Sequence, residues 1–184
     1  LDFATGNENW SLPQAFNHRT ITSPIVVKDD PVTGDVLIAA GNKNGVYFAA
    51  RMPRISNGER VSEPAKVWSM ESRAPYVPTP AVVSDVVYAL HDGGTLSALD
   101  SSTGSVNWQG KLLGNFYASP VLVGDKLYCL SREGDMWIVE PGDEFKLLKT
   151  SSLNPPEDVT FCDATPAVAH NRLYVRMGSR LDCF

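Results

Sequence analysis

The chain has 184 residues, of which 43% are hydrophobic, so it is long enough to bury a core as one domain. Its formal net charge is −5 at pH 7, which argues against a nucleic-acid-binding surface spread over the whole molecule. Its longest apolar runs, such as Val86–Leu90, have the length of a strand rather than the roughly 20 residues that cross a bilayer. We therefore expect no nucleic-acid partner and no membrane-spanning segment.

A hydroxyl residue followed by a proline and a short apolar run recurs four times along the chain. The four copies begin at Ser23, Thr79, Ser119 and Thr165. After a turn, each copy is followed by a second apolar run, and three of these runs centre on a tyrosine: Tyr88, Tyr128 and Tyr174. Apolar runs of this length between turn residues predict antiparallel hairpins.

A further strand in each period carries the strongest internal match. The segment 99–108 has the pattern Leu-Asp-x-x-Thr-Gly-x-x-x-Trp, and the opening segment 1–10 has the same pattern. Four short strands in each period predict a four-stranded antiparallel sheet, which buries its faces only against neighbouring copies. The sequence thus predicts an all-β fold, a β-propeller with four blades in this chain.

These motifs, together with Ser/Thr-Pro-x-Val and Gly-x-Leu-x-Ala-Leu-Asp, resemble the repeats of the pyrroloquinoline-quinone-type (quinoprotein-like) β-propeller superfamily. In that superfamily the tryptophan of the motif docks between adjacent blades. The resemblance implies this structural role for Trp10, Trp68 and Trp108. A large apolar ring with a single hydrogen-bond donor also suits such a seam on physical grounds.

The repeats set the expected domain organisation, which is one propeller domain or propeller segment over residues 1–184. The expected blades cover approximately residues 22–68, 79–108, 119–149, and 165–184 completed by 1–12. The last blade is thus split between the two ends of the chain, which closes a ring and hides two strand edges. Two alternatives stay open: self-association of two chains to complete a larger ring, or a segment of a longer propeller.

The superfamily has two branches with different functions. In quinoprotein dehydrogenases the quinone binds on the propeller axis, beside a catalytic aspartate, calcium and adjacent cysteines. None of these features can be placed here: no two of the three cysteines, Cys129, Cys162 and Cys183, are adjacent, and no tryptophan platform for the quinone is identifiable. The other branch resembles the propeller lipoprotein of outer-membrane barrel assembly, which has no cofactor and binds proteins. We therefore expect a non-catalytic scaffold for a protein or peptide partner, and the resemblance alone implies a periplasmic or other extracytoplasmic location.

Catalysis finds no support in the residues themselves. The histidines lie in different repeats, and no Gly-x-Ser-x-Gly nucleophile motif occurs. We expect no catalytic residue, no cofactor and no metal. The alternatives that stay open are part of a quinone-dependent dehydrogenase propeller, or a carbohydrate-binding propeller in which Trp137 and Tyr76 are exposed stacking platforms.

The loops that enter the inner strands and the turns between second and third strands are expected to share one face of the molecule. The candidate binding residues on this loop face are Arg19, Tyr76, His91, Phe116, Tyr117, Arg132, Asp163 and Arg176, and Phe161 lies in the same set of loops. Exposed aromatic residues beside arginine are typical of protein interfaces. The alternative is that these rings pack toward the axis and the charges are only solvated.

Two features outside the loop face complete the sequence-based expectations. The loops 28–34 and 50–66 lengthen the first repeat, and Asp29, Asp30 and Asp35 beside them lack the ligand spacing of a calcium loop. Cys129 and Cys183 lie in apolar strand patterns, so we expect both to be buried thiols. A disulfide between Cys162 and Cys183 stays open as an alternative.

Overall fold

The structure of the chain is a computed structural model that describes residues 4–32, 35–43, 46–56 and 59–184. These residues form four antiparallel sheets, which we number I to IV in chain order, and a short two-stranded ribbon. The prediction of an all-β chain with four repeated antiparallel sheets is therefore confirmed. In the described part of the chain, no helix has the length and apolar character needed to cross a membrane.

The first three sheets have four strands each. Sheet I contains β1 (Ile25–Asp30), β2 (Asp35–Asn42), β3 (Val46–Arg51) and β6 (Ala65–Met70). Sheet II contains β7 (Ala81–Val83), β8 (Val86–Leu90), β9 (Thr95–Asp100) and β10 (Val106–Lys111). Sheet III contains β11 (Val121–Val123), β12 (Lys126–Leu130), β13 (Asp135–Glu140) and β14 (Lys146–Ser152).

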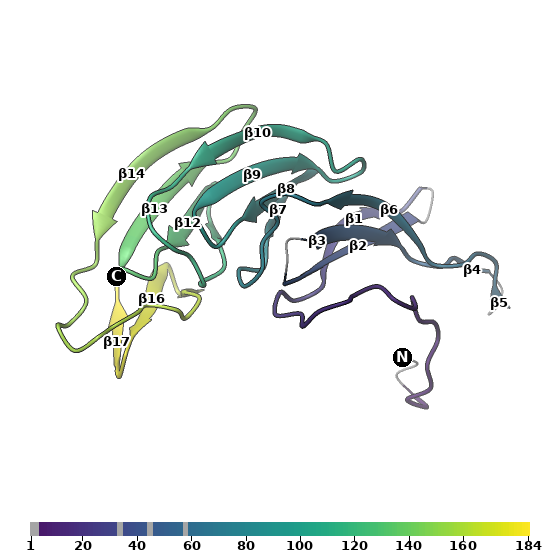
Figure 1. Ribbon diagram of the computed structural model, residues 1–184, viewed down its shortest axis with the longest axis horizontal. Helices are drawn as coiled ribbons and strands as arrows, with labels where there is room; N and C mark the ends of the chain where they lie inside the picture. Colours follow the sequence, from purple (N-terminus) through teal and green to yellow (C-terminus); the bar gives the residue numbers. More distant parts are fainter. Residues whose placement is uncertain (1–3, 33–34, 44–45, 57–58) are drawn as a thin grey trace.

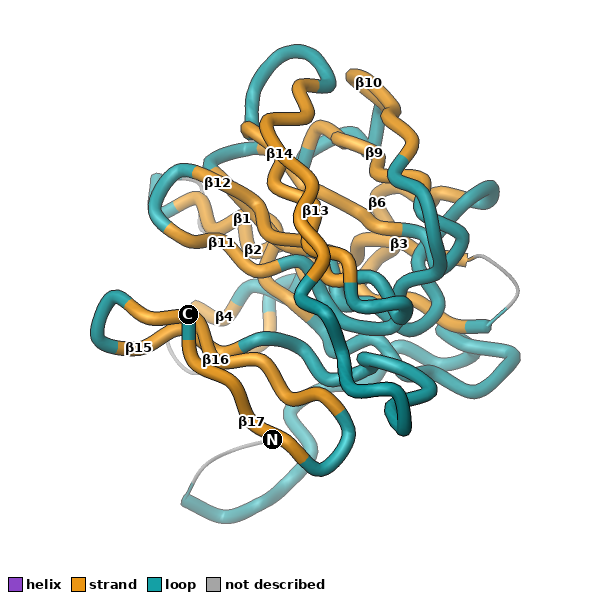
Figure 2. Tube along the Cα trace, turned by 90° about the vertical axis from the view of Figure 1, so that its left-hand side faces the viewer, coloured by secondary structure: helices purple, strands orange, loops and turns teal. Residues whose placement is uncertain are grey.

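Sheet IV has three strands in the described residues. They are β15 (Ala167–Ala169), β16 (Arg172–Met177) and β17 (Arg180–Cys183). The two-stranded ribbon, β4 (Ile55–Ser56) and β5 (Glu59–Arg60), lies in the long connection between β3 and β6. Figure 1 shows the sheets following one another along an open arc, with the two chain ends at opposite ends of the arc. Figure 2 shows sheet IV in the foreground, with the strands of sheet I further from the viewer.

Each sheet has two apolar faces because residues along a strand point alternately to either side. In β8, Val87 and Ala89 point back toward sheet I, while Tyr88 and Leu90 point forward toward sheet III, and all four are at most 2% exposed. We call these the trailing and the leading face of a sheet. Because both faces of sheets II and III are covered, their inner strands β8, β12 and β13 are apolar at most positions rather than at every second one.

Hydrophobic clusters fill the seams between successive sheets. Between sheets II and III, Tyr88 and Leu96 of one leading face pack in a single cluster with Leu127 and Val139 of the next trailing face. Equivalent clusters join sheets I and II and sheets III and IV. Each such large side chain, when fully buried, contributes about 1.5–3 kcal/mol relative to exposure. The face-to-face seams are therefore the main source of stability.

The hydroxyl residues of the four repeated motifs link the sheets along their inner edge. The main-chain N–H of Ser23 donates to Thr79 Oγ1 at 2.9 Å, and that of Thr79 donates to Ser119 Oγ at 2.9 Å. The N–H of Ser119 continues the series with a 3.0 Å bond to Thr165 Oγ1. The recurring Ser/Thr before each proline thus holds each sheet at a fixed distance from the next.

The start of the chain differs from the expected split blade. Within residues 4–12 no strand forms, and residues 1–3 lie outside the described residues. Instead, Trp10, Leu12 and Phe16 line an apolar hollow on the trailing face of sheet I, where the ring centres of Phe16 and Phe48 are 5.3 Å apart. The segment lies there because sheet I presents an uncovered apolar face, whereas the open edge of sheet IV lies at the other end of the arc.

The three cysteines are free thiols in the structure. Cys129 and Cys162 are buried, and burial raises the pKa of the Cys129 thiol to about 12. Cys183 is exposed, which corrects the expectation that it is buried. The physical reason is its position on the leading face of sheet IV, which no further sheet covers in the described residues.

Candidate functional site

The loop face expected from the strand order is built by main-chain hydrogen bonds between the two kinds of loop. The N–H of Phe116, in the loop entering sheet III, donates to Asp92 O in the β8–β9 turn at 2.8 Å. The N–H of Cys162, in the loop entering sheet IV, donates to Arg132 O in the β12–β13 turn at 2.8 Å. These bonds place each entering loop against the turn of the preceding sheet.

Four side chains on this face form a cluster around Arg132. The Cζ atom of Arg132 lies 3.7 Å from the ring centre of Phe161 and 4.0 Å from that of Tyr117. Its Nε donates to Asp163 Oδ1 at 2.7 Å, and a terminal nitrogen donates to Asp163 Oδ2 at 3.1 Å. We call Tyr117, Arg132, Phe161 and Asp163 the Arg132 cluster. It joins loops of sheets III and IV with cation–π and bidentate contacts.

The electrostatics of the cluster keep it charged and ordered. Hydrogen bonding to Asp163 raises the pKa of the Arg132 guanidinium above its already high ordinary value. The Arg132 side chain is 19% exposed, so its flat faces are largely covered by the two rings. Phe161 remains 47% exposed, which leaves a large apolar ring on the surface with a fixed orientation.

A small hollow adjoins the Arg132 cluster. It has a volume of about 150 Å³ and is lined by Phe161, Asp163, Ala164, Arg176 and Gly178. The Nε of Arg176 donates to Gly178 O at 2.9 Å, which fixes this second guanidinium at the rim. Sites for whole cofactors are typically about 300–1,000 Å³, so the hollow has the size for one side chain of a partner.

A second arginine–aromatic pair lies at the other end of the loop face. The Cζ of Arg19 is 5.5 Å from the ring centre of Tyr76, so the loop entering sheet I contacts the loop entering sheet II. The N–H of Tyr76 donates to Asp92 Oδ1 at 3.1 Å, which anchors that loop to its own sheet. The structure therefore brings five of the eight candidate residues into two arginine–aromatic groups, and a sixth, Arg176, lines the hollow beside the first group.

The remaining two candidates have structural roles. Phe116 is fully buried, so it is not available to a partner, which corrects the expectation for this residue. It packs into the II–III seam, where a Cβ on Gly94 would lie 3.0 Å from its ring. His91 is half-buried, and its Nδ1 accepts a hydrogen bond from the N–H of Gly93 at 3.0 Å within the same turn.

The tryptophans expected at the seams have well-defined partners. Nε1–H of Trp68 donates to Ser101 O in sheet II at 2.9 Å, and Nε1–H of Trp108 donates to Gly142 O in sheet III at 2.8 Å. The structure thus places both rings against the following sheet. Trp10 lines the hollow on the trailing face of sheet I together with Met52, which follows β3.

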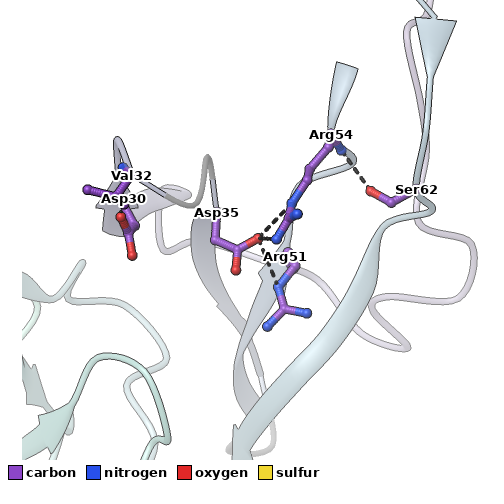
Figure 3. A network of polar contacts seen from close by, with 6 residues as sticks. All are labelled: Asp30, Val32, Asp35, Arg51, Arg54 and Ser62. Atoms are coloured by element: carbon purple, nitrogen blue, oxygen red, sulfur yellow. Dashed lines mark hydrogen bonds and ion pairs between the residues drawn. The ribbon is translucent and has the colours of Figure 1, made fainter. Parts of the chain in front are cut away.

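The lengthened loops of sheet I are tied together by ion pairs (Figure 3). Asp35 Oδ1 accepts from Nε of Arg54 at 3.1 Å and from a terminal nitrogen of Arg54 at 2.7 Å. Arg51 Nε lies 3.6 Å from the same oxygen. Among the described residues, no group of three or more His, Cys, Asp or Glu side chains lies close enough to hold a metal ion. Residues 33–34 and 57–58 of these loops lie outside the described residues.

Most residues of the loop face can be predicted from the sequence, but their grouping cannot. Phe161 stood among the loop residues but not among the candidate binding residues, and Ala164 and Gly178 carried no signal. Arg132 and Asp163 are 31 positions apart, so their pairing depends on how sheet IV packs on sheet III. The sequence signal for this cluster is the loop between the third and fourth repeats, in which an aromatic residue, Phe161, and an acidic residue, Asp163, are two positions apart.

The fold and the arginine–aromatic loop face define a protein of the β-propeller repeat class. The PQQ_2 family model, described as outer membrane protein assembly factor BamB, matches residues 59–176, which is well over half of the chain. The chain therefore belongs to this BamB-type family of β-propeller repeat proteins. The resemblance inferred from the motifs is confirmed.

Solved structures agree with this assignment at the level of the fold. BamB from Moraxella catarrhalis is 19% identical with a TM-score of 0.59, and the match covers 82% of this chain and 42% of that one. The computationally designed Ika4 protein is 13% identical with a TM-score of 0.67, covering 97% of this chain and 98% of that one. Quinohemoprotein alcohol dehydrogenase from Pseudomonas putida HK5 is 15% identical with a TM-score of 0.59, covering 87% and 28%. This chain thus spans less than half the length of BamB, and a comparison with curated proteins gives no match.

Proposed function

We propose that the chain is a non-catalytic binding scaffold, and that the Arg132 cluster with its adjoining hollow binds a segment of a partner protein. The observation that carries the proposal is the fixed geometry of Phe161, which is 47% exposed and stacked on Arg132. Aromatic and arginine side chains held in place before binding lose little conformational entropy, and such residues often dominate interface energies.

The chemistry of the hollow defines the partner segment. Phe161 offers an apolar wall, and Arg176 places a positive charge at the rim. A partner residue with an apolar side chain, followed by an acidic group or a chain-terminal carboxylate, matches both features. We propose that the flanking backbone of the segment runs along the loop face toward Tyr76 and Arg19. We therefore propose an extended, acidic protein segment as the ligand.

Family membership supports a cellular location for the proposed binding scaffold. The family is described as an outer membrane protein assembly factor, and its member from Moraxella catarrhalis shares this fold. We propose on this ground that the chain acts outside the cytoplasm, in an outer-membrane assembly context. Fractionation of the source cells, with antibody detection of the native protein, tests this part of the proposal independently of ligand binding.

The two alternative functions, carbohydrate binding and quinone-dependent dehydrogenation, have unequal support. A carbohydrate site needs Trp137 as a platform, yet Trp137 is only 8% exposed and packs in the II–III seam. The likeness to quinohemoprotein alcohol dehydrogenase supports a shared fold and no more. Addition of pyrroloquinoline quinone with calcium tests the dehydrogenase alternative directly. A bound-quinone spectrum with dye-linked alcohol oxidation would favour that alternative over the scaffold.

The binding proposal is tested with a peptide ligand selected on the protein itself. A display library of linear peptides is selected against the immobilised chain, and the affinity of a selected peptide is measured by fluorescence anisotropy. We expect Phe161→Ser to weaken binding at least tenfold. Val106→Ser is the matched control, because Val106 is 50% exposed on the outer strand β10, away from the loop face. Unchanged affinity in the Phe161 variant, or equal loss in both variants, would contradict the proposal.

A further inference from the structure

A hollow lies between sheets II and III at the strand ends remote from the loop face. Its volume is about 540 Å³, within the range of about 300–1,000 Å³ that is typical of ligand sites. Successive turns of an antiparallel sheet alternate between its two ends, so the β7–β8 and β13–β14 turns at this hollow lie opposite the turns of the loop face. We call it the II–III hollow, and its lining residues are Val83, Ser84, Val86, Tyr88, Asn107, Pro141, Gly142 and Asp143. All of them belong to sheets II and III or to their turns, so the uncovered faces of sheets I and IV take no part in it.

One wall of the II–III hollow is fixed by hydrogen bonds across the seam. Oη of Tyr88 accepts from the N–H of Gly142 at 3.1 Å, and Gly142 O accepts from Nε1–H of Trp108 at 2.8 Å. The β13–β14 turn of sheet III is thus held on sheet II through both polar groups of one residue. Tyr88 is 2% exposed, and its hydroxyl end lies beside Gly142 at the wall of the hollow. A phenolic oxygen has two acceptor sites, and the bond from Gly142 uses one of them.

The II–III hollow carries a negative charge. Asp143 is the charged residue of its lining at neutral pH, and no lysine, arginine or histidine among the described residues lines it. Burial raises the pKa of Tyr88 and the charge of Asp143 raises it further, so the phenol stays neutral beside the carboxylate. Ser84 and Asn107 add a hydroxyl and an amide, each with an acceptor oxygen. An anionic ligand would therefore meet a carboxylate with no cation to compensate it.

A second hollow on the other side of the β7–β8 turn has the same sign of charge. Its volume is about 490 Å³, and it lies between sheets I and II and shares Ser84 with the II–III hollow. The charged residues of its lining are one lysine and three aspartates: Lys28, Asp29, Asp30 and Asp85. Nζ of Lys28 donates to Ser102 Oγ at 2.8 Å, which holds this ammonium beside sheet II. The negative potential thus extends over both hollows and attracts cations to this end of the sheets.

One carboxylate, neutral acceptors and apolar walls together suit an alkylammonium group. An ammonium has three N–H donors and no acceptor, which matches the carboxylate of Asp143 and the second acceptor site of Tyr88 Oη. The apolar walls suit a methylene stem, since lysine side chains bury their stems along apolar surface. These walls come from Val83, Val86 and Pro141.

We propose that the II–III hollow binds an alkylammonium group, carried by a lysine side chain of a partner protein or by a free aliphatic amine. The ammonium contacts Asp143 and Tyr88 Oη, and the stem lies along the apolar walls. This site goes beyond the binding proposed for the Arg132 cluster, because it lies at the other ends of the strands and takes a ligand of the opposite charge.

NMR titration of the isotope-labelled chain tests this site with defined probes. The probe is Nα-acetyl-lysine amide, and Nα-acetyl-norleucine amide is its match with the same carbon stem and no charge. We expect saturable shift changes at the amides of Val86, Asn107 and Gly142 with the lysine probe alone. Asp143→Asn is expected to weaken its binding at least fivefold, because the charged acceptor is lost. Asp125→Asn is the matched control, since it removes the same charge from an exposed carboxylate in the β11–β12 turn, which lines neither hollow.

A free diamine distinguishes the two sources of the ammonium group. Tighter binding of 1,5-diaminopentane than of the lysine probe assigns the site to free amines, and the reverse order assigns it to a lysine side chain. Equal shifts with the norleucine probe, equal weakening in the two asparagine variants, or no saturable shift up to about 50 mM of either amine would overturn the inference. Circular dichroism confirms that both variants keep their β structure. Phe161→Ser is expected to leave binding of the lysine probe unchanged, so this test and the loop-face test fail separately.

Discussion

The indole N–H of Trp68 donates to the main-chain carbonyl of Ser101 at 2.9 Å, across the seam between sheets I and II. The same ring lies 6.0 Å from the ring centre of Tyr47 within its own sheet. A single side chain thus combines apolar packing with the one polar contact that the buried ring needs. This relationship explains why a tryptophan, rather than another apolar residue, ends the repeated motif.

Trp68→Phe is expected to lower the free energy of unfolding by about 1–3 kcal/mol. The substitution removes the donor to Ser101 O, which is then left unsatisfied, and it leaves part of the seam empty. Urea unfolding followed by circular dichroism measures the change. Val67→Ala is the control on the same strand, because Val67 is 37% exposed, and its effect is expected to stay within about 0.5 kcal/mol. Equal effects of the two substitutions would contradict the seam assignment of Trp68.

Gly104, the glycine of the Thr-Gly pair in sheet II, lies against this tryptophan. Gly104 has a φ of +71°, and a Cβ at this position would lie 2.6 Å from Cδ2 of Trp68. Gly124 has a φ of +61°, and no atom lies within 4 Å of the Cβ that an alanine would add there, so Gly124→Ala carries the backbone strain alone. Gly104→Ala is expected to destabilise the protein by about 1–3 kcal/mol more than Gly124→Ala, as measured by urea unfolding. Equal destabilisation would show that Trp68 does not pack against the turn.

Asp100 gives the stability a pH dependence that can be measured. Its Oδ1 accepts hydrogen bonds from Thr103 Oγ1 and from the N–H groups of Thr103 and Ser102, and these bonds lower the pKa of the carboxyl group. Because the pKa is lower in the folded state, this stabilisation is fully present above the ordinary value of 3.8 and is lost as the pH falls through the folded-state pKa. Asp100→Asn is therefore expected to lose less stability than the unmodified protein between about pH 4 and pH 2. Identical slopes of unfolding midpoint against pH would contradict this.

Arg132→Lys separates the shape of the guanidinium from its charge. Lysine keeps the positive charge but lacks the flat group that stacks on Phe161 and binds Asp163 through two bonds. The affinity for a peptide selected on the loop face is expected to fall about tenfold, because Phe161 loses its fixed orientation. Arg60→Lys is the control, since Arg60 lies in the ribbon strand β5, outside the loop face. Full affinity in Arg132→Lys would show that only the charge matters.

The sequence was sufficient to predict the sheets because the signals for strands and turns are local. The motifs beginning at Thr79 and Ser119 each contain a proline, an apolar run and a turn within a few positions, and each forms the predicted hairpin. The series of hydrogen bonds from each main-chain N–H to the hydroxyl of the next repeat cannot be predicted in this way, since it requires the distance between successive sheets. The position of Trp10 was not foreseen either, because it depends on which apolar face the start of the chain covers.

The loop face shows the same division between local and long-range information. Tyr117 and Arg132 belonged to the predicted face because strand order determines which loops share an end of the sheets. Phe116, next to Tyr117, was placed on the surface, yet it fills the seam between sheets II and III. Adjacent residues of an extended loop point to opposite sides, and composition does not say which of two aromatic neighbours faces inward.

The central claim, that the loop face around Arg132 is the binding surface, is tested most directly by NMR titration of the isotope-labelled chain with a selected peptide. The account predicts amide shift changes concentrated in residues 115–118, 131–134, 161–164 and 176–178, with little change in the outer strands β6, β10 and β14. Shift changes centred on those outer strands, with the Arg132 loops unaffected, would contradict it.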